Sequence, residues 1–385
     1  MSQPRILHAS DLHFGLARYG TDPATGLPRD YLSARQVLSF IASTAIEREV
    51  DALILSGDQF DKGAPAMEAV LAMAEILRDV VRSGIAVVIV GGNHENIGLP
   101  VRFRSANALL ADMLSAYGTV RVADAAPAGI LLPNGIQVAA MPWLDKPKML
   151  NALGIDPRTI TGSDAALVTL YVEHFESMMN RVNTGMPIIA ASHVTVDASI
   201  QRGSELELCA HLLSEPIIPA RVFDDSPAHY AALGHIHTAA DVGRIGRYAG
   251  SANRLTFADA GVPKTISLVT LDPSGSKVEQ IPTPAMLLQR LDVDSISDAR
   301  PAAVVELTLP VGLSDPDPRH VAAIRDAGAV LHTCVRTPAP PSASTRVSIH
   351  ESASAPDAMS AWLDAHHPDA DKAAVLAAAR EVTSA

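Results

Sequence analysis

The sequence predicts an α/β fold, in which helices cover both faces of a largely parallel sheet. Two observations lead to this prediction. Residues 5–9, 51–56 and 85–90 are short apolar runs without alternation, as expected for strands that are buried on both faces. Segments with helical spacing, over residues 29–48 and 65–83, separate these runs. Strands that alternate with helices in this way are typical of a parallel sheet.

The same pattern continues through the middle of the chain. Residues 137–141, 186–192 and 229–233 are further apolar runs and are expected to be strands, with a helix over residues 164–182. Between residues 243 and 282 the pattern shortens to strand-like pieces separated by turns. The chain has 385 residues, which exceeds the length of most single domains. We therefore expect one large domain followed by a smaller one.

The smaller unit is expected after residue 282. It contains a strand, a helix and a strand at residues 303–309, 320–327 and 330–335. A stretch rich in proline and serine follows and predicts a linker, and an alanine-rich stretch after it predicts one or two helices. The sequence thus divides into a large domain, a small domain, a linker and a helical tail, which span residues 1–282, 283–336, 337–355 and 356–385.

Composition and charge limit the classes of function. Hydrophobic residues make up 48% of the chain, which is enough for a sizeable core. No run of about 18 uncharged apolar residues is present, so no membrane span is expected. The formal net charge is -12, whereas proteins that bind nucleic acids usually have a basic surface. This balance counts against strong autonomous DNA binding, although a basic groove can coexist with an acidic remainder.

Two features favour a cytoplasmic location. The N-terminal residues lead directly into the first predicted strand, which leaves no room for a signal peptide. Cys209 and Cys334 do not form a disulfide framework, and a reducing compartment suits them as small buried residues.

Five short polar blocks stand where predicted strands end. They are Asp11-Leu12-His13, Gly57-Asp58-Gln59-Phe60-Asp61, Gly92-Asn93-His94-Glu95, Ser192-His193 and Gly234-His235-Ile236-His237. Ligand-binding groups of open α/β sheets gather at the carboxyl ends of the strands, so we expect these blocks to converge on one edge. Their carboxylates, amide and imidazoles suit Mn²⁺, Fe²⁺ or Zn²⁺ better than soft metals.

This set of residues predicts a two-metal phosphoesterase site. Asp58 is the natural candidate to bridge two ions, because a carboxylate offers two oxygens. Two ions roughly 3.5–4 Å apart clamp the attacking and leaving oxygens of a phosphate and lower the pKa of bound water. Gly57, Gly92 and Gly234 are expected to permit tight turns that aim the next side chain inward. Each block alone is common in surface turns, whereas the ordered set is specific.

The five blocks resemble those of the calcineurin-like metallophosphoesterase superfamily. Within it, the chain is similar to the Mre11/SbcD nucleases, the nuclease subunits of a DNA double-strand-break repair complex. Three stretches carry this closer resemblance, and they are Asp11-Leu12-His13-Phe14-Gly15, Gly57-Asp58-Gln59-Phe60-Asp61 and Tyr248-Ala249-Gly250-Ser251. The resemblance covers roughly residues 4–282. It implies a sandwich of two mixed sheets flanked by helices, followed by a small C-terminal α/β cap and a helical tail.

The resemblance also implies roles for individual residues. One metal ion would be held by Asp11, His13, Asp58 and His237. The other would be held by Asp58, Asn93, His193 and His235. His94 matches the family's catalytic histidine, which contacts the scissile phosphate and helps to protonate the leaving oxygen. Asp61 would orient and charge His94 in a carboxylate–imidazole dyad.

Two residues depart from related patterns. Glu95 stands where these nucleases usually have Asp, a substitution that related phosphatases share. Lys62 replaces the Arg that Ser/Thr phosphatases carry after their Gly-Asp-x-x-Asp, which argues against a protein phosphatase.

The resemblance finally implies the activity and the partners. We expect a nuclease with two divalent metal ions, in first place manganese, that hydrolyses DNA as an exonuclease with some endonuclease activity. The expected partners are DNA, an SMC-family ATPase of the Rad50/SbcC type and a second copy of the chain. The helical tail would dock on the ATPase, although packing back on its own domain is equally compatible with its sequence. The alternatives are a small-molecule phosphodiesterase or phosphatase, and a DNA-end-binding scaffold without catalysis.

Two residues near the blocks have no assigned role. His8 lies within the first predicted strand and is interpreted as a core or edge histidine rather than a ligand. Arg254 follows the Tyr248-Ala249-Gly250-Ser251 stretch and is interpreted as a surface residue, with a phosphate contact as the alternative.

Overall fold

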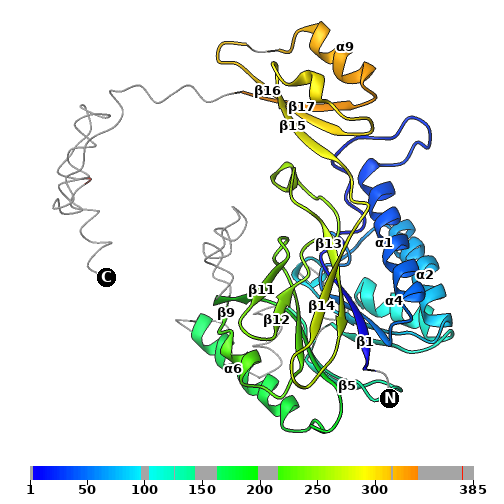
Figure 1. Ribbon diagram of the computed structural model, residues 1–385, viewed down its shortest axis with the longest axis vertical. Helices are drawn as coiled ribbons and strands as arrows, with labels where there is room; N and C mark the ends of the chain where they lie inside the picture. The colour runs from blue at the N-terminus through cyan, green and yellow to red at the C-terminus, as the bar shows by residue number, and fades with distance from the viewer. Residues whose placement is uncertain are drawn as a thin grey trace.

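A computed structural model describes residues 3–96, 104–124, 126–143, 163–197, 216–313 and 315–336, together with residue 375. Cys209, the predicted linker and, apart from residue 375, the predicted helical tail lie outside the described residues. Figure 1 shows a large unit in the lower part of the molecule and a small unit above it.

The first sheet of the large unit carries three of the polar blocks. Its strand order is β14–β13–β1–β2–β3–β4, in which β1 to β4 run parallel and β13 and β14 are antiparallel. The strands span Arg5–Ala9 (β1), Ala52–Ser56 (β2), Ala86–Val90 (β3), Val120–Ala123 (β4), Thr265–Thr270 (β13) and Lys277–Pro282 (β14). Because β1, β2 and β3 are parallel neighbours, the residues that follow them emerge at the same edge.

The second sheet carries the other two blocks. Its order is β11–β12–β10–β7–β6–β5, with four parallel strands in the middle and antiparallel strands at both edges. The strands span Ala128–Leu131 (β5), Gln137–Met141 (β6), Ile188–His193 (β7), Tyr230–Gly234 (β10), Ala240–Val242 (β11) and Gly246–Tyr248 (β12). Gly234 pairs with His193 in the register of β10 and β7, which sets His235 beside His193.

The two sheets stack face to face, and helices cover both outer faces. Residues such as Ile54 and Val88 meet Val138 and Ile189 in an apolar core between the sheets. On the first sheet lie α1 (Arg29–Glu47), α2 (Met67–Arg82) and α4 (Ala106–Ser115), and on the second lie α6 (Ser163–Met179) and α8 (Arg221–Asp224). Figure 1 shows α1, α2 and α4 on one side and α6 on the other. The predicted sandwich of two mixed sheets is therefore confirmed.

Local chemistry decides where the helices begin. Ser105 caps α4, because its side chain accepts a hydrogen bond from the amide of Ala108. Asp317 caps α9 (Pro318–Asp326) in the same way, and Pro318 occupies its first turn. This helix therefore starts two residues before the apolar spacing indicated. The shorter elements are α3 (Asn93–Asn96), β8 (Thr195–Val196), β9 (Ile217–Ile218), η3 (Phe257–Asp259) and η4 (Ile296–Asp298).

The small unit is a parallel three-stranded sheet with one helix against it. Its strands are β15 (Leu288–Asp292), β16 (Val304–Leu309) and β17 (Val330–Arg336), in that order. Ile324 of α9 packs on the β16 residues Val305 and Leu307. The expected strand, helix and strand are confirmed, and β15 adds a third strand. No helix among the described residues is long and apolar enough to cross a membrane.

Candidate metal centre

The structure brings all nine predicted site residues to one edge of the sandwich. Three of the segments follow β1, β2 and β3 of the first sheet, and the others end β7 or follow β10 of the second sheet. The side chains that meet there are Asp11, His13, Asp58, Asp61, Asn93, His94, His193, His235 and His237. Strand ends from both sheets thus form a single site.

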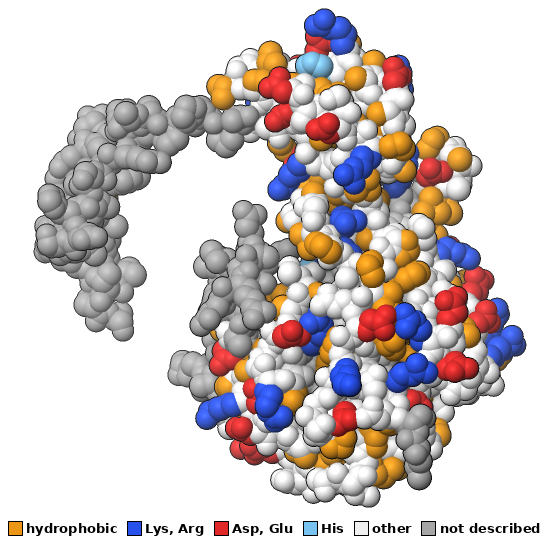
Figure 2. Space-filling model, viewed as in Figure 1, with side chains coloured by type: hydrophobic (Ala, Val, Ile, Leu, Met, Phe, Trp, Pro, Cys, Tyr) orange, Lys and Arg blue, Asp and Glu red, His pale blue; other side chains and the backbone are white. Residues whose placement is uncertain are grey.

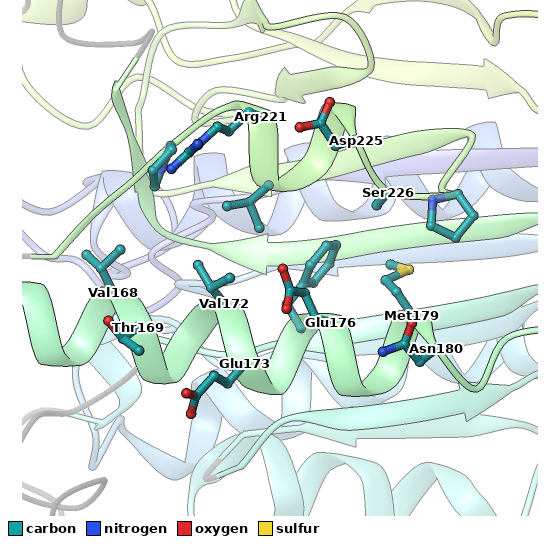
Figure 3. Close-up of a pocket in the computed structure, with 14 residues that line it drawn as sticks. Val168, Thr169, Val172, Glu173, Glu176, Met179, Asn180, Arg221, Asp225 and Ser226 are labelled. Atoms are coloured by element: carbon teal, nitrogen blue, oxygen red, sulfur yellow. The ribbon is translucent and has the colours of Figure 1, made fainter.

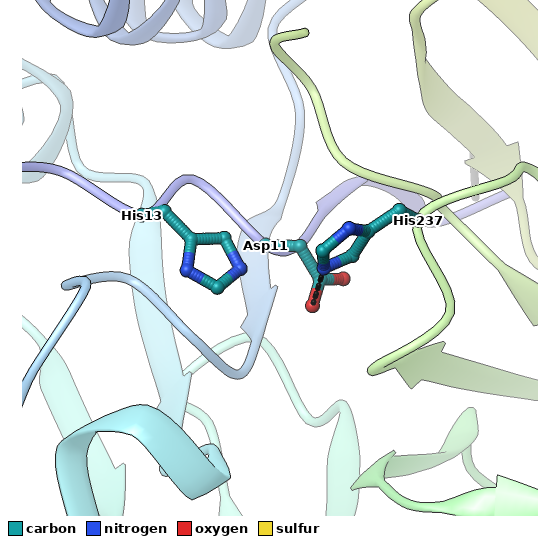
Figure 4. Close-up of side chains that lie close together, drawn as sticks. All are labelled: Asp11, His13 and His237. Atoms are coloured by element: carbon teal, nitrogen blue, oxygen red, sulfur yellow. Dashed lines mark ion pairs between the residues drawn. The ribbon is translucent and has the colours of Figure 1, made fainter. Parts of the chain in front are cut away.

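Asp11, His13 and His237 form one group of ligand atoms, all within 4.8 Å of one another. Figure 4 shows the two imidazoles on either side of the Asp11 carboxylate. The Nε2 atom of His237 lies 3.9 Å from Oδ1 of Asp11. Asp11 is fully buried and accepts hydrogen bonds from the hydroxyl of Ser10 and the amide of His235. The Asp11 carboxylate is therefore already held in place by the protein.

Asp58 lies at the centre of the site. Its Oδ2 atom is 3.4 Å from Nε2 of His193 and 3.7 Å from Nε2 of His13, so one oxygen faces histidines from both sheets. Its Oδ1 atom accepts a hydrogen bond from the amide of His94 at 2.9 Å. A buried carboxylate between two imidazoles is well placed to bridge two cations.

Asn93 lies beside the two histidines of the second sheet. Its Oδ1 atom is 3.0 Å from Nε2 of His193 and 3.3 Å from Nδ1 of His235. The other ring nitrogen of His193 donates to the carbonyl of Ser56 at 2.9 Å, which leaves Nε2 facing the site. These three residues form a second group that adjoins the first at Asp58.

His94 lies at the open side of the site and is 36% exposed. Its Nδ1 atom bonds to the backbone carbonyl of Asp61 at 2.8 Å, while the Asp61 carboxylate is 3.9 Å from the same nitrogen. That carboxylate is also 3.7 Å from Nδ1 of His13. The backbone of Asp61 therefore orients His94, and its carboxylate lies between His94 and His13.

The backbone is strained where it presents these side chains. Asp11, His13, Asp58 and His235 have φ angles of 52°, 44°, 51° and 102°. Only six non-glycine residues in the described part of the chain have positive φ, so two thirds of them belong to the site. Such conformations cost free energy and persist where the surrounding structure requires them, which is common at functional sites.

The glycines of the blocks act in two different ways. Gly57 has a φ of +103° and provides the turn that the sequence predicts. Gly92 and Gly234 have no positive φ, and a Cβ atom at these positions would lie 2.1 Å from Oδ1 of Asp58 and 1.9 Å from the carbonyl oxygen of Ser56. They are needed for close approach of two strand ends rather than for a turn, which corrects the expectation for these two positions.

The charges of the site polarise its histidines in opposite directions. Burial alone would lower the pKa of His193, but the Asp58 carboxylate raises this pKa to about 9. In return, the histidines hold the pKa of Asp58 far below its usual range despite burial. Burial lowers the pKa of His237 to about 4, and Asp11 only partly offsets this effect. Asp58 is thus anionic and available to cations.

A sequence comparison then places the chain among known proteins. The model of the calcineurin-like phosphoesterase family matches residues 4–239, which is more than half of the chain. The chain belongs to this family.

Named relatives of this metallophosphoesterase include a nuclease and a DNA repair protein. It is 28% identical over 289 residues to SbcD of the SbcCD nuclease from Escherichia coli (strain K12), covering 72% of this chain and 67% of that protein. It is 24% identical over 296 residues to the DNA double-strand break repair protein Mre11 of Aeropyrum pernix, covering 76% and 64%. The matched region thus spans about two thirds of these relatives. Among solved structures, TT1561 of Thermus thermophilus has a TM-score of 0.41 at 12% identity and covers 72% of this chain and 99% of that one.

The side chains of this metallophosphoesterase fit two divalent ions. The Nε2 atom of His13 is buried and has no hydrogen-bond partner, although it points to Asp58. An unpaired buried nitrogen is costly in a protein interior, and a metal ion at this place would satisfy it. Two carboxylates, one amide oxygen and four imidazoles are the donor types that manganese, iron or zinc accept.

Three residues support the site without an assigned role in the sequence. Glu95 is fully buried and accepts hydrogen bonds from the amides of Phe60 and Gly92, so it joins the loops after β2 and β3. The hydroxyl of Tyr248 donates to the carbonyl of Val194 and thereby fixes the segment after His193. The ring of Trp143 lies 5.1 Å from that of His235. Glu95 and Tyr248 were noted as markers of resemblance, but sequence alone does not reveal such contacts.

The largest cavity in the described part of the molecule lies elsewhere. It has a volume of about 660 Å³ and lies between α6 and the segment around α8. Figure 3 shows Val168, Val172 and Met179 of α6 on one side of it and Arg221 and Asp225 on the other. None of the nine site residues lines this cavity, so cavity size does not locate the metal centre.

Proposed function

We propose that the protein is a manganese-dependent DNA nuclease, an exonuclease with some endonuclease activity. The observation that carries the proposal is the Asp58 carboxylate, which lies between His13 of one ligand group and His193 of the other. A shared carboxylate is what a two-metal phosphoesterase requires. The sequence relationship to the SbcCD nuclease and to the DNA repair protein Mre11 supports DNA as the substrate.

The ligands divide into two overlapping sets in this proposal. Asp11, His13, Asp58 and His237 hold one ion, and Asp58, Asn93, His193 and His235 hold the other. When bound, the two ions supply Lewis-acid activation of water and of the phosphodiester. The protein contributes the order of this site, because hydrogen bonds from the backbone already fix Asp11 and Asp58.

His94 handles the proton of the leaving group. Its Nδ1 atom donates to the carbonyl of Asp61, so Nε2 is the atom that carries the transferable proton in the imidazolium form. Release of this proton to the leaving oxygen returns His94 to the neutral tautomer that the Asp61 carbonyl already selects. The Asp61 carboxylate, 3.9 Å away, stabilises the imidazolium before transfer.

Further parts of the proposal concern domains and partners. Residues 1–282 form the nuclease domain and residues 283–336 a cap that contributes to DNA selection, with a linker and a docking tail after them. The partners are an SMC-family ATPase of the SbcC/Rad50 type and a second copy of the chain, in the cytoplasm. Figure 2 shows basic and acidic side chains interspersed on the face in view. With a net charge of -12, this distribution supports a DNA grip that is shared with the ATPase.

The test is hydrolysis by the purified chain in the presence of Mn²⁺. End-labelled single- and double-stranded DNA and bis-p-nitrophenyl phosphate are offered in parallel. Asp58→Ala and His94→Ala are expected to abolish DNA cutting, since the first removes the shared carboxylate and the second the proton donor. Losses of about 100-fold or more are typical for such groups.

The outcomes separate the candidate functions. Hydrolysis of the small ester without DNA cutting, even with the candidate ATPase added, would support a small-molecule phosphodiesterase instead. Cellular DNA repair that survives His94→Ala would indicate a scaffold whose catalysis is dispensable. Asp79→Ala, on the exposed side of α2, is the matched control and should cut DNA like the wild type.

A further inference from the structure

His237 differs from the other candidate ligands in how it is held. Its imidazole is 21% exposed and makes no hydrogen bond to any described residue, with Asp11 at 3.9 Å as its nearest charged partner. The imidazole of His193, in contrast, donates to the carbonyl of Ser56. Histidines that bind metals usually donate their second ring nitrogen to a group that fixes the ring. His237 must therefore be oriented mainly through its backbone.

The backbone carbonyl of His237 is held by two residues from other segments. It accepts hydrogen bonds from the amide of Ser251 at 3.0 Å and from the Nζ atom of Lys264 at 3.1 Å. The hydroxyl of Ser251 also contacts it at 3.4 Å. Lys264 directly precedes β13 of the first sheet, whereas His237 follows β10 of the second. The contact therefore ties the His237 loop to the opposite sheet.

Lys264 is itself fully committed to this contact. Only 4% of the residue is exposed, and its ammonium group bonds to the His237 carbonyl, to the Ser251 hydroxyl at 2.7 Å and to Asp259 at 2.6 Å. These three acceptors use its three N–H groups. Lysines are almost never buried unless they are paired, and Asp259 provides the opposite charge. The ammonium has no freedom to rotate away from His237.

Asp259 is fixed in turn. One carboxylate oxygen bonds to Lys264, and the other accepts hydrogen bonds from the amides of Leu255 and Thr256. The carboxylate is therefore saturated on both sides. His237, Ser251, Lys264 and Asp259 form a closed polar cluster behind the metal centre, which we call the His237 clamp.

We propose that Lys264 is a positioning residue that holds the His237 imidazole against Asp11 and so sets the affinity for one of the two metal ions. The inference rests on the proposed function, because it takes His237 as a ligand. Loss of the ammonium frees the His237 carbonyl on one side and lets the exposed imidazole turn away from Asp11. The ion between Asn93, His193 and His235 is held by other segments and is not affected.

The test is a Mn²⁺ titration of the metal-free full chain, followed by calorimetry and by electron paramagnetic resonance of free Mn²⁺. Lys264→Met removes the ammonium and keeps most of the side-chain volume. One of the two ions should then bind about 10–100-fold more weakly, which is the usual effect of losing an outer partner of a ligand. Lys277→Met, which removes an exposed lysine of β14, should leave both affinities unchanged.

Two results would overturn the proposal. One is wild-type affinity for both ions in Lys264→Met, and the other is an equal loss at both sites, which indicates general loosening. If Lys264→Met does not fold, as judged by circular dichroism, Ser251→Ala decides, because it removes a hydroxyl of the clamp without removing a charge. It should weaken the same ion to a smaller extent, and two unchanged affinities would contradict the clamp. A wild-type chain that binds no Mn²⁺ would instead refute the proposed function.

Discussion

His8 is a neutral histidine buried between the two sheets. It is fully buried, and its ring nitrogens bond to the hydroxyls of Tyr230 at 2.9 Å and Ser56 at 2.7 Å. Burial, assisted by the positive charge of Arg247, lowers the pKa of His8 from 6.5 to about 3. The interpretation of this residue as a core histidine is confirmed, and its contacts link β1, β2 and β10 across the sandwich.

This lowered pKa predicts a pH dependence of stability. Below about pH 6.5 the unfolded chain binds a proton at His8 that the folded protein does not bind until about pH 3. The free energy of unfolding should therefore fall as the pH decreases through this window. His8→Gln, which keeps one polar contact but does not titrate, should gain on the wild type by roughly 3 kcal/mol between pH 7 and pH 4.

The measurement is urea unfolding of both metal-free proteins at several pH values. The other titrating groups are shared, so the difference between the two proteins reports on His8 alone. A difference in free energy that stays constant from pH 7 to pH 4 would mean that the folded protein accepts the proton and that His8 is not held neutral.

At the scale of residues, sequence could predict which side chains meet but not how they are held. Asp58 and His193 were predictable, because polar residues at the ends of buried strands converge on one edge. The left-handed backbone of Asp11 and His13 was not, because it depends on how the strand ends close on each other. The role of Lys264 was equally hidden, since its partners lie at least five residues away along the chain.

At the scale of elements, long helices and buried strands were predictable and short edge elements were not. The helix over residues 29–48 corresponds to α1 within one residue, because nineteen residues carry a clear apolar period. β4 and β5 have four residues each and expose part of them, so they leave no period to detect. α4 was also not anticipated, although Ser105 provides its cap.

α2 and α4 together expose an apolar face on the outside of the large unit. Met67 and Leu71 of α2 are 58% and 45% exposed, and Leu109 and Met113 of α4 are 40% and 39% exposed. Each pair is spaced by four residues and so lies on one face of its helix. The two helices pack against each other, which makes the face continuous enough to suit a second copy of the chain.

This face predicts how the expected dimer can be broken. Leu71→Glu places a charge on the apolar face and should weaken self-association by about 100-fold, since a buried interface charge costs several kcal/mol. Light scattering coupled to size-exclusion chromatography measures the mass across a concentration series. Leu131→Glu is the control, because Leu131 is 64% exposed on β5 of the second sheet. A Leu71→Glu chain with the same mass as a dimeric wild type would exclude this face.

At the scale of the whole molecule, Arg254 joins the small unit to the large one. Its guanidinium donates to the carbonyls of Ala285 and Met286, which precede β15, and to that of Val262. The expectation of a surface residue is therefore wrong, and all these donors are directed away from a phosphate role. Nearby, the ring of His332 from β17 stacks on Phe257 at 5.9 Å. One loop of the large unit thus carries both contacts.

Arg254→Ala should loosen this connection without disturbing the metal centre. Loss of hydrogen bonds from a charged donor costs roughly 1.5 kcal/mol or more, so amides near residues 284–290 should exchange hydrogen about tenfold faster. If the small unit helps to hold DNA, DNA cutting should fall several-fold while hydrolysis of bis-p-nitrophenyl phosphate stays the same, because the small ester needs only the ions and His94. Arg121→Ala on exposed β4 is the control. Unchanged exchange would contradict the joining role of Arg254, and equal loss of both activities would mean that the small unit acts on the catalytic site itself.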